Sequence, residues 1–227
     1  PSFAGGAIGY LGFGCSAWFE PTLAKTIPQQ TTEAEFMFCR TIVAFDHARQ
    51  TIKIVSLVFS DEANGSAERL DELFGTARKR NADIRERLES TPLNLPAKAE
   101  KAEIAGVVSN FIRTDFETAV LKIKEAIAAG DAYQVVLSQR FSRETSASAV
   151  AVYRAMRSLN PSPYMFLINV GGRSIIGASP EMLVRCRGNR LEYRPIAGTR
   201  PRGKSTGEDN KLAEEMRADR KEVAEHL

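Results

Sequence analysis

Residues 160–199 read "NPSPYMFLINVGGRSIIGASPEMLVRCRGNRLEYRPIAGT", and this stretch decides the fold class. Its short apolar runs are separated by glycine turns at Gly171-Gly172 and Gly188-Asn189. Runs and turns at this spacing predict an antiparallel β-meander. Segments with a helical period lie on both sides of it. The predicted class is therefore α+β, with antiparallel β-sheets covered by helices.

Outside the meander, the apolar period predicts helices over residues 67–88 and 147–159, and a charged amphipathic helix over 208–227. Another helix is expected between Thr114 and Gly130. Thr114 and Glu117 would form its capping box, and Gly130 suits its end.

Two further segments have the pattern of strands. "AYQVVLSQRF" (132–141) alternates between two faces, as a strand does. Residues 35–59 contain two β-rich runs around a polar turn, which predicts a hairpin.

The composition is that of an ordinary globular protein. The chain has 227 residues, 43% of them hydrophobic, and a formal net charge of +3, so no global field points to nucleic acid or an anionic membrane. No apolar run approaches the roughly 18 residues of a membrane helix. Three scattered cysteines outside any CxxC pair fit a reducing cytoplasm better than a disulfide framework.

The ends of the sequence lack the usual signals. It starts at Pro1 in a Gly-rich apolar stretch and stops in "KEVAEHL", inside an expected helix. We therefore expect a piece of a longer polypeptide. Residues 91–108 are rich in charge and contain Pro92 and Pro96, so they are the expected linker between residues 1–90 and 109–227.

Glu181 is the first candidate for chemistry. It lies in "GASPEML" among apolar strand residues. A carboxylate near a sheet core tends to have a raised pKa, which suits a general acid. The alternative is a solvated glutamate at the end of a strand, which is the commoner state of this residue type.

Glu222 and Glu225 lie three residues apart on the final helix, and therefore on one face. Paired carboxylates of this kind can hold Mg²⁺ together with waters and an anionic substrate group. The alternative is an ordinary solvated face that pairs with Lys221 and Arg217.

Residues 194–204, "RPIAGTRPRGK", form a basic, turn-prone loop. Gly198 would let a ligand approach the backbone closely, and Thr199 offers a hydroxyl. The cations could attract an anionic substrate. One alternative is a basic surface hairpin. Another is a nucleic-acid patch formed with the nearby Arg185, Arg187 and Arg190, which is disfavoured because Tyr193 is the single aromatic side chain of residues 185–204.

Several long motifs occur together and in order: "GDAYQVVLSQRF", "NPSPYMF", "GASPEMLVR", "RPIAGTRPRG" and "KEVAEHL". In this the chain resembles the chorismate-utilising enzymes, and among them most closely the large subunits (component I) of anthranilate synthase. The resemblance covers the whole chain and is strongest from Ser109 onward. "GGAIGYLGF" near the start is also similar, whereas "GCSAW" departs from the family's pattern.

The resemblance implies a fold, a reaction and roles for residues. Residues 1–90 would end the family's N-terminal region, and 109–227 would begin the chorismate-binding catalytic domain. Glu181 matches the acid that protonates the departing C4 hydroxyl. Glu222 and Glu225 match one of two glutamate pairs that hold Mg²⁺. Gly198 and Thr199 match residues that contact chorismate.

Two positions distinguish branches of the family. Gln134 stands where water-using members carry a lysine base, and Ala197 stands where aminodeoxychorismate synthases typically carry a nucleophilic lysine. Neutral ammonia needs neither group. The combination implies anthranilate synthase, which makes anthranilate and pyruvate from chorismate and ammonia. An amidotransferase subunit, component II, would supply ammonia from glutamine.

The resemblance also implies a feedback site and an incomplete active site. Part of a tryptophan-binding site is matched by Asn160, Pro161, Ser162, Pro163, Tyr164 and Met165. The family's catalytic histidine, second glutamate pair and chorismate-gripping arginine are absent, so we expect this piece alone to be inactive. The alternatives are a folate-branch aminodeoxychorismate synthase and a non-catalytic basic binding module.

Overall fold

The computed structural model describes residues 3–27, 34–92, 106–196, 198–220 and 222–223. The chain folds as two compact units. One contains Pro1–Leu95 and Tyr153–Leu227, and the other contains Pro96–Val152. The functional boundary at residues 91–108 stays a prediction, and positions 93–105 of that linker lie outside the described residues.

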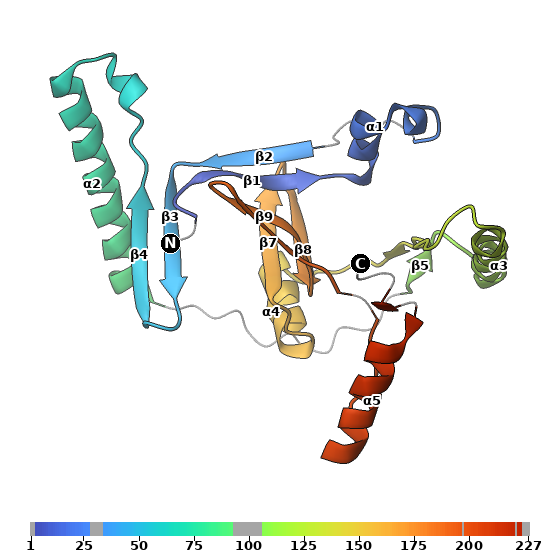
Figure 1. Cartoon of the computed structure of the whole chain (residues 1–227). Helices are drawn as coiled ribbons and strands as arrows, with labels where there is room; N and C mark the ends of the chain where they lie inside the picture. The colour runs from blue at the N-terminus through green and yellow to red at the C-terminus, as the bar shows by residue number, and fades with distance from the viewer. Residues whose placement is uncertain (1–2, 28–33, 93–105, 197, 221, 224–227) are drawn as a thin grey trace. The chain divides into compact units, whose positions relative to one another are not determined.

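The strands of the first unit pair two by two, and every pair is antiparallel (Figure 1). The pairs are β1 (Gly6–Leu11) with β2 (Ala34–Cys39), β3 (Thr41–Asp46) with β4 (Thr51–Ser56), β7 (Tyr164–Val170) with β8 (Arg173–Ser179), and β9 (Met182–Arg187) with β10 (Arg190–Arg194). Together with the helices, these pairs confirm the α+β class.

The meander is present as two hairpins and not as one continuous sheet. Gly171, Gly172 and Gly188 have φ angles of 57°, 76° and 56°, the left-handed values that tight hairpin turns need, so the predicted turns are confirmed. Among the described residues, β8 and β9 do not pair. Pro180 and Glu181 separate them, and proline has no N–H to donate to a ladder.

The hairpin predicted over residues 35–59 is confirmed for residues 41–56, which form β3, a turn and β4. β3 and β4 pair in register from Thr41 opposite Ser56 to Asp46 opposite Thr51. The first run divides at Arg40, because the residues before it form β2 and pair with β1 instead.

The helices that lie wholly in the first unit are α1 (Ser16–Phe19), α2 (Ala67–Ser90) and α5 (Thr206–Ala218). Short 3-10 helices lie at Phe13–Cys15, Pro21–Lys25 and Ser60–Ala63. α4 (Ala149–Leu159) begins in the second unit and continues into the first. α2 and α4 confirm the predictions for residues 67–88 and 147–159.

The final helix is shorter than predicted. α5 ends at Ala218, because Asp219 has an extended conformation with φ −67° and ψ 117°. Helical geometry resumes at Arg220, Glu222 and Val223. One unbroken helix over residues 208–227 is therefore wrong for the described part.

α2 packs along β4 (Figure 1). Its half-buried positions are Leu70, Leu73, Ala77, Asn81 and Ile84, whereas two other apolar residues at the helical period, Phe74 and Leu88, are exposed. The polar member of the half-buried set is satisfied across the interface, since the Asn81 Oδ1 accepts from the Ser56 hydroxyl at 2.7 Å. The Ser56 hydroxyl in turn lies 2.8 Å from that of Thr41 on β3.

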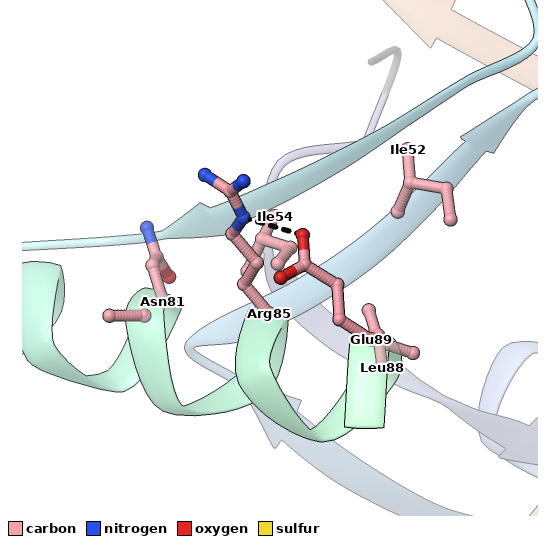
Figure 2. Close-up of a pocket in the computed structure, with 7 residues that line it drawn as sticks. Ile52, Ile54, Asn81, Arg85, Leu88 and Glu89 are labelled. Carbon is pink, nitrogen blue, oxygen red and sulfur yellow. Dashed lines mark hydrogen bonds and ion pairs between the residues drawn. The ribbon is translucent and has the colours of Figure 1, made fainter. Parts of the chain in front are cut away.

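An open groove of about 630 Å³ runs beside this contact (Figure 2). It is lined by Ile52, Ile54, Asn81, Ala82, Arg85, Leu88 and Glu89. The Arg85 Nε donates to the Glu89 Oε1 at 2.8 Å along one turn of α2. The two charged side chains that line the groove therefore neutralise each other.

The second unit contains α3 (Arg113–Ala129), β5 (Val108–Ser109) and β6 (Phe141–Ser142). Gly130 ends α3 with φ 88°, which confirms its role as a cap. The predicted capping box is wrong, because the helix begins after Ile112 without a side-chain cap and Glu117 binds Arg113 at 2.7 Å.

The strand predicted over residues 132–141 is also wrong for most of its length. Among the described residues, Phe141 alone of that range is in a ladder, opposite Ser109. Alternation of apolar and polar residues indicates that a segment could form a strand, but the strand forms only where a second strand pairs with it.

Burial in the described part of the chain is sparse. The buried hydrophobic residues there are Cys15, Ala63 and Met182. Large apolar side chains such as Phe13 and Phe38 are 86% exposed. Across the described ranges, none of the helices combines the length and apolar character needed to span a bilayer.

Candidate functional site

The basic loop that joins β10 to α5 forms hydrogen bonds with the first turn of the helix. The Arg202 Nε donates to the Asp209 Oδ1 at 2.8 Å, and the Gly203 N–H donates to the same oxygen at 2.8 Å. The Arg202 guanidinium, followed by the Gly203 amide, lowers the pKa of the Asp209 carboxyl. The loop is thus a structured entry to α5 and not a free basic hairpin.

Glu181 lies in the turn between β8 and β9, and its side chain is exposed. The carboxylate Oε1 accepts from the Ile196 N–H at 3.1 Å. The Ser179 hydroxyl donates to the Glu181 carbonyl at 3.1 Å and holds the turn. Of the two positions considered, the one near a sheet core is wrong and the exposed one at the end of a strand is confirmed, because β8 ends two residues earlier and the carboxylate faces the loop after β10.

Glu222 is half-buried, with 11% of its side chain accessible. Its carboxylate accepts from the Gly198 N–H. It also accepts from the Arg200 Nη1 at 3.5 Å. Glu222 therefore lies against the same loop as Glu181.

The structure brings these predicted residues together on one short segment. Glu181 binds the amide of residue 196, and Glu222 binds the amide of Gly198. Thr199 follows directly. Three segments far apart in the sequence thus meet at the loop: the β8–β9 turn, the residues after β10, and the turn after α5.

An added side chain would meet close neighbours at two positions of this loop. A Cβ on Gly203 would clash with the backbone of Asp209, which requires glycine there, whereas a Cβ on Gly198 would meet the carboxylate of Glu222 and displace that side chain. A shallow groove of about 340 Å³ lies between the loop and α5. It is lined by Gly198, Thr199, Arg200, Pro201, Arg202, Asp209, Leu212, Ala213 and Met216.

Glu222 fits one place in a Mg²⁺ site, since carboxylate oxygens are the ligands that this ion prefers. The described residues contain no group of three or more His, Cys, Asp or Glu side chains placed to hold a metal. A complete site would need further oxygen ligands from elsewhere. Glu225, its predicted companion, lies outside the described residues.

Gln134 belongs to the second unit, where it is exposed on the extended segment before β6. Ala197, the other position that distinguishes the branches, lies outside the described residues. The pairing of Gln134 with Ala197 in one site stays a prediction.

The predicted feedback segment connects α4 to β7. The Asn160 N–H donates to the Met156 carbonyl at 2.8 Å and ends the helix. Pro161 and Pro163 are exposed, whereas Ser162 and Met165 are half-buried. Tyr164 lies opposite Ser179 in the β7–β8 ladder, next to the turn that carries Glu181.

Sequence reasoning missed two contributors to the site. Ser205 caps α5 by accepting from the Glu208 N–H at 3.3 Å, and the Ser-x-x-Glu pattern that signals such a cap is present in "STGE". Asp219 ends α5 and binds Arg200 at 2.8 Å. An aspartate just before a helical stretch is itself a capping signal.

Comparison with known proteins gives a consistent result. The family described as "chorismate binding enzyme" matches residues 1–227. The chain is 38% identical to an anthranilate synthase component 1 from Geobacillus stearothermophilus, over 99% of this chain and 45% of that protein. It is 40% identical to one from Acetivibrio thermocellus, over 100% of this chain and 46% of that protein.

A solved structure is also similar. The chain matches the crystal structure of anthranilate synthase component I from Streptococcus pneumoniae TIGR4 with a TM-score of 0.74 and 30% sequence identity. The match covers 99% of this chain and 47% of that one. The chain therefore spans about half the length of the relatives it matches.

Proposed function

Because the chain belongs to the family of chorismate-binding enzymes, we propose that the whole protein converts chorismate and ammonia to anthranilate, pyruvate and water. Relatives 38% and 40% identical to this chain bear the name anthranilate synthase component 1. The observation that carries the proposal is the convergence of Glu181 and Glu222 on the amides of Ile196 and Gly198.

Glu181 is the proposed general acid. Its Oε1 accepts from the Ile196 N–H, so the proton for the leaving group would sit on the other oxygen, Oε2. Delivered to the C4 hydroxyl of chorismate, that proton lets the oxygen leave as water while ammonia adds at C2. Loss of pyruvate then gives the aromatic ring.

Gly198 and Thr199 are the proposed contacts to chorismate, and they line the groove beside α5. Gln134 and Ala197 are proposed to leave room for ammonia, which is nucleophilic when neutral and needs no base. With lysine in place of Ala197, the folate-branch reaction would be expected instead.

Glu222 and Glu225 are the proposed Mg²⁺ ligands in the whole protein. The ion would supply positive charge for the carboxylate of chorismate. Glu222→Gln should weaken Mn²⁺ binding about tenfold or more, measured by electron paramagnetic resonance, because a neutral amide is a poorer ligand than a carboxylate. Glu215→Gln, on an exposed ion pair of α5, is the control. Equal Mn²⁺ affinity in both variants would contradict this assignment.

The proposal extends to partners and to location. A protein named component 1 has a second component, which we propose to be a glutamine amidotransferase that supplies ammonia. L-Tryptophan is the proposed inhibitor, bound partly by residues 160–165. A cytoplasmic location is proposed because the three cysteines are scattered along the sequence and none belongs to a CxxC pair, a usage typical of a reducing compartment.

The test uses the full-length protein with chorismate, an ammonium salt and Mg²⁺. We expect anthranilate fluorescence and an equal amount of pyruvate. Glu181→Gln should lower kcat by about 10²- to 10⁴-fold, the range for loss of a general acid. Glu89→Gln, in an exposed ion pair of α2, should leave kcat unchanged.

Three other outcomes would overturn parts of the proposal. Release of aminodeoxychorismate without pyruvate would indicate the folate-branch enzyme. No turnover of chorismate together with steeply salt-dependent retention on DNA would indicate a basic binding module. Equal rates for Glu181→Gln and Glu89→Gln would remove Glu181 as the acid.

A further inference from the structure

The Arg200 side chain connects the loop to both ends of the break after α5. Its Nη2 donates to the Asp219 Oδ2 at 2.8 Å, and its Nη1 lies 3.5 Å from the Glu222 Oε1. The same Nη1 donates to the Thr199 carbonyl at 3.1 Å. Arg200 is 31% exposed, so most of its side chain is enclosed by these partners.

Asp219 has two roles at this point. Its Oδ2 holds Arg200, and its Oδ1 lies 3.4 Å from the Glu222 N–H. Its carbonyl accepts from the Val223 N–H at 3.0 Å, which starts the helical turn that carries Glu222. One aspartate thus fixes both the guanidinium and the backbone of the glutamate that the guanidinium faces.

We propose that Arg200 and Asp219 are positioning residues, which hold the Glu222 carboxylate against the Gly198 amide and so fix the Gly198–Thr199 segment. This inference rests on the proposed function for the meaning of that segment. The guanidinium is a rigid planar fork that is always charged, so it can satisfy two carboxylates and a carbonyl at once. Without it, Glu222 would lose the cation that holds its carboxylate against the Gly198 amide.

The loop contains an internal comparison. Arg202 also pairs with an aspartate, Asp209, at the same 2.8 Å. That pair lies at the start of α5, and its hydrogen bonds involve neither Glu222 nor the Gly198 amide. Arg202 is 89% exposed. Removing Arg202 therefore changes the charge of the same loop but leaves the hydrogen bonds of Arg200 in place, so Arg202→Gln is the matched control for amide exchange.

The first experiment measures steady-state kinetics of the full-length enzyme. Arg200→Gln should raise KM for chorismate by about 10- to 100-fold, the usual effect of losing a residue that orients a ligand contact. Arg69→Gln, in an exposed ion pair of α2, should change KM by less than about threefold. Arg200→Lys should restore part of the loss, because lysine keeps the charge but not the fork.

The second experiment does not depend on turnover. Hydrogen–deuterium exchange of a peptide containing residues 196–200 should be faster in Arg200→Gln and in Asp219→Asn than in the wild type and Arg202→Gln. If the wild type fails to convert chorismate but this pattern appears, the proposed function fails and the positioning role stands. If Arg200→Gln and Arg200→Lys both match Arg69→Gln in KM and match Arg202→Gln in exchange, the positioning role is overturned.

Discussion

At Gly198, the absence of a side chain allows two segments of the chain to meet. A Cβ there would lie 1.8 Å from the Glu222 Oε1, far inside van der Waals contact. Gly198→Ala should therefore push Glu222 away from the amide and lower kcat/KM for chorismate by about 100-fold, the effect of a misplacement near 1 Å. The measurement is anthranilate formation by the full-length protein.

Gly207→Ala is the matched control for that substitution. Gly207 lies in the first turn of α5, and nothing lies within 4 Å of a Cβ added there. Its activity should equal that of the wild type. Wild-type kcat/KM in Gly198→Ala would show that the close approach has no part in the reaction.

Part of the site could be predicted from single residues, and part could not. Gly198, Glu181 and Glu222 lie in motifs whose residue types suggest their chemistry. The Arg200–Asp219 pair spans 19 residues and forms because α5 stops at Asp219, so it depends on a break that periodicity does not reveal. The pairing of Arg200 with Asp219 therefore becomes visible only once the fold is known.

Among the elements, the β7–β8 hairpin depends on one glycine. Phe166 lies opposite Gly177, and a Cβ on Gly177 would be 2.1 Å from the Phe166 ring. Gly177→Ala should displace the ring and lower the free energy of unfolding by about 1–3 kcal/mol, the usual cost of overpacking. Urea denaturation of the full-length protein would measure it.

A second glycine gives the opposite expectation. Gly75 lies inside α2, with nothing within 4 Å of an added Cβ. Gly75→Ala should stabilise the protein by about 0.5–1 kcal/mol, since alanine loses less backbone entropy in a helix. If both variants moved the urea midpoint in the same direction, the explanation from steric space would be wrong.

The start of α5 gives a pH dependence. Arg202 lowers the pKa of the folded Asp209 carboxyl below its ordinary value of 3.8. Because the folded pKa is the lower one, this stabilisation is complete above pH 3.8 and is lost as the pH falls through the folded value. Asp209→Asn should therefore reduce the difference in Tm between pH 7 and pH 3.

Asp71→Asn is the control for this pH effect. Asp71 is exposed on α2 and makes no hydrogen bond or ion pair within the ranges that the structure describes. Its Tm difference should match that of the wild type. A wild-type pH dependence in Asp209→Asn would contradict the role of the Arg202–Asp209 pair.

Elements whose causes are local could be predicted well. α2 follows from an apolar stripe within one segment, and the β7–β8 turn follows from two adjacent glycines. The strand expected over residues 132–141 failed because a strand also depends on a distant partner, which alternation does not identify. The helix over 208–227 failed at Asp219, where a side-chain cap competes with continuation of the helix.

For the molecule as a whole, the exposed surface is the informative quantity. Within the described ranges, the buried hydrophobic residues are Cys15, Ala63 and Met182, whereas large apolar side chains such as Phe13 and Phe38 are 86% exposed. Soluble monomers rarely leave so many large apolar side chains in contact with water.

The 227 residues expressed alone should therefore be poorly stable. We expect strong binding of the dye ANS, a low urea midpoint, self-association through strand edges, and no anthranilate from chorismate, ammonium and Mg²⁺. The full-length protein is the control in each assay. A monomeric, cooperatively unfolding fragment that turns over chorismate would contradict this expectation.

The pairing of strands with their neighbours in sequence has a consequence for synthesis on the ribosome. The β3–β4, β7–β8 and β9–β10 hairpins each close over a few residues. A hairpin forms in about 1–10 μs, whereas the ribosome adds about 5–20 residues per second. Each hairpin can thus form within the time that the ribosome needs to add one amino acid. Each strand of these hairpins would then have one edge already paired, which protects that edge from neighbouring nascent chains on the same messenger RNA.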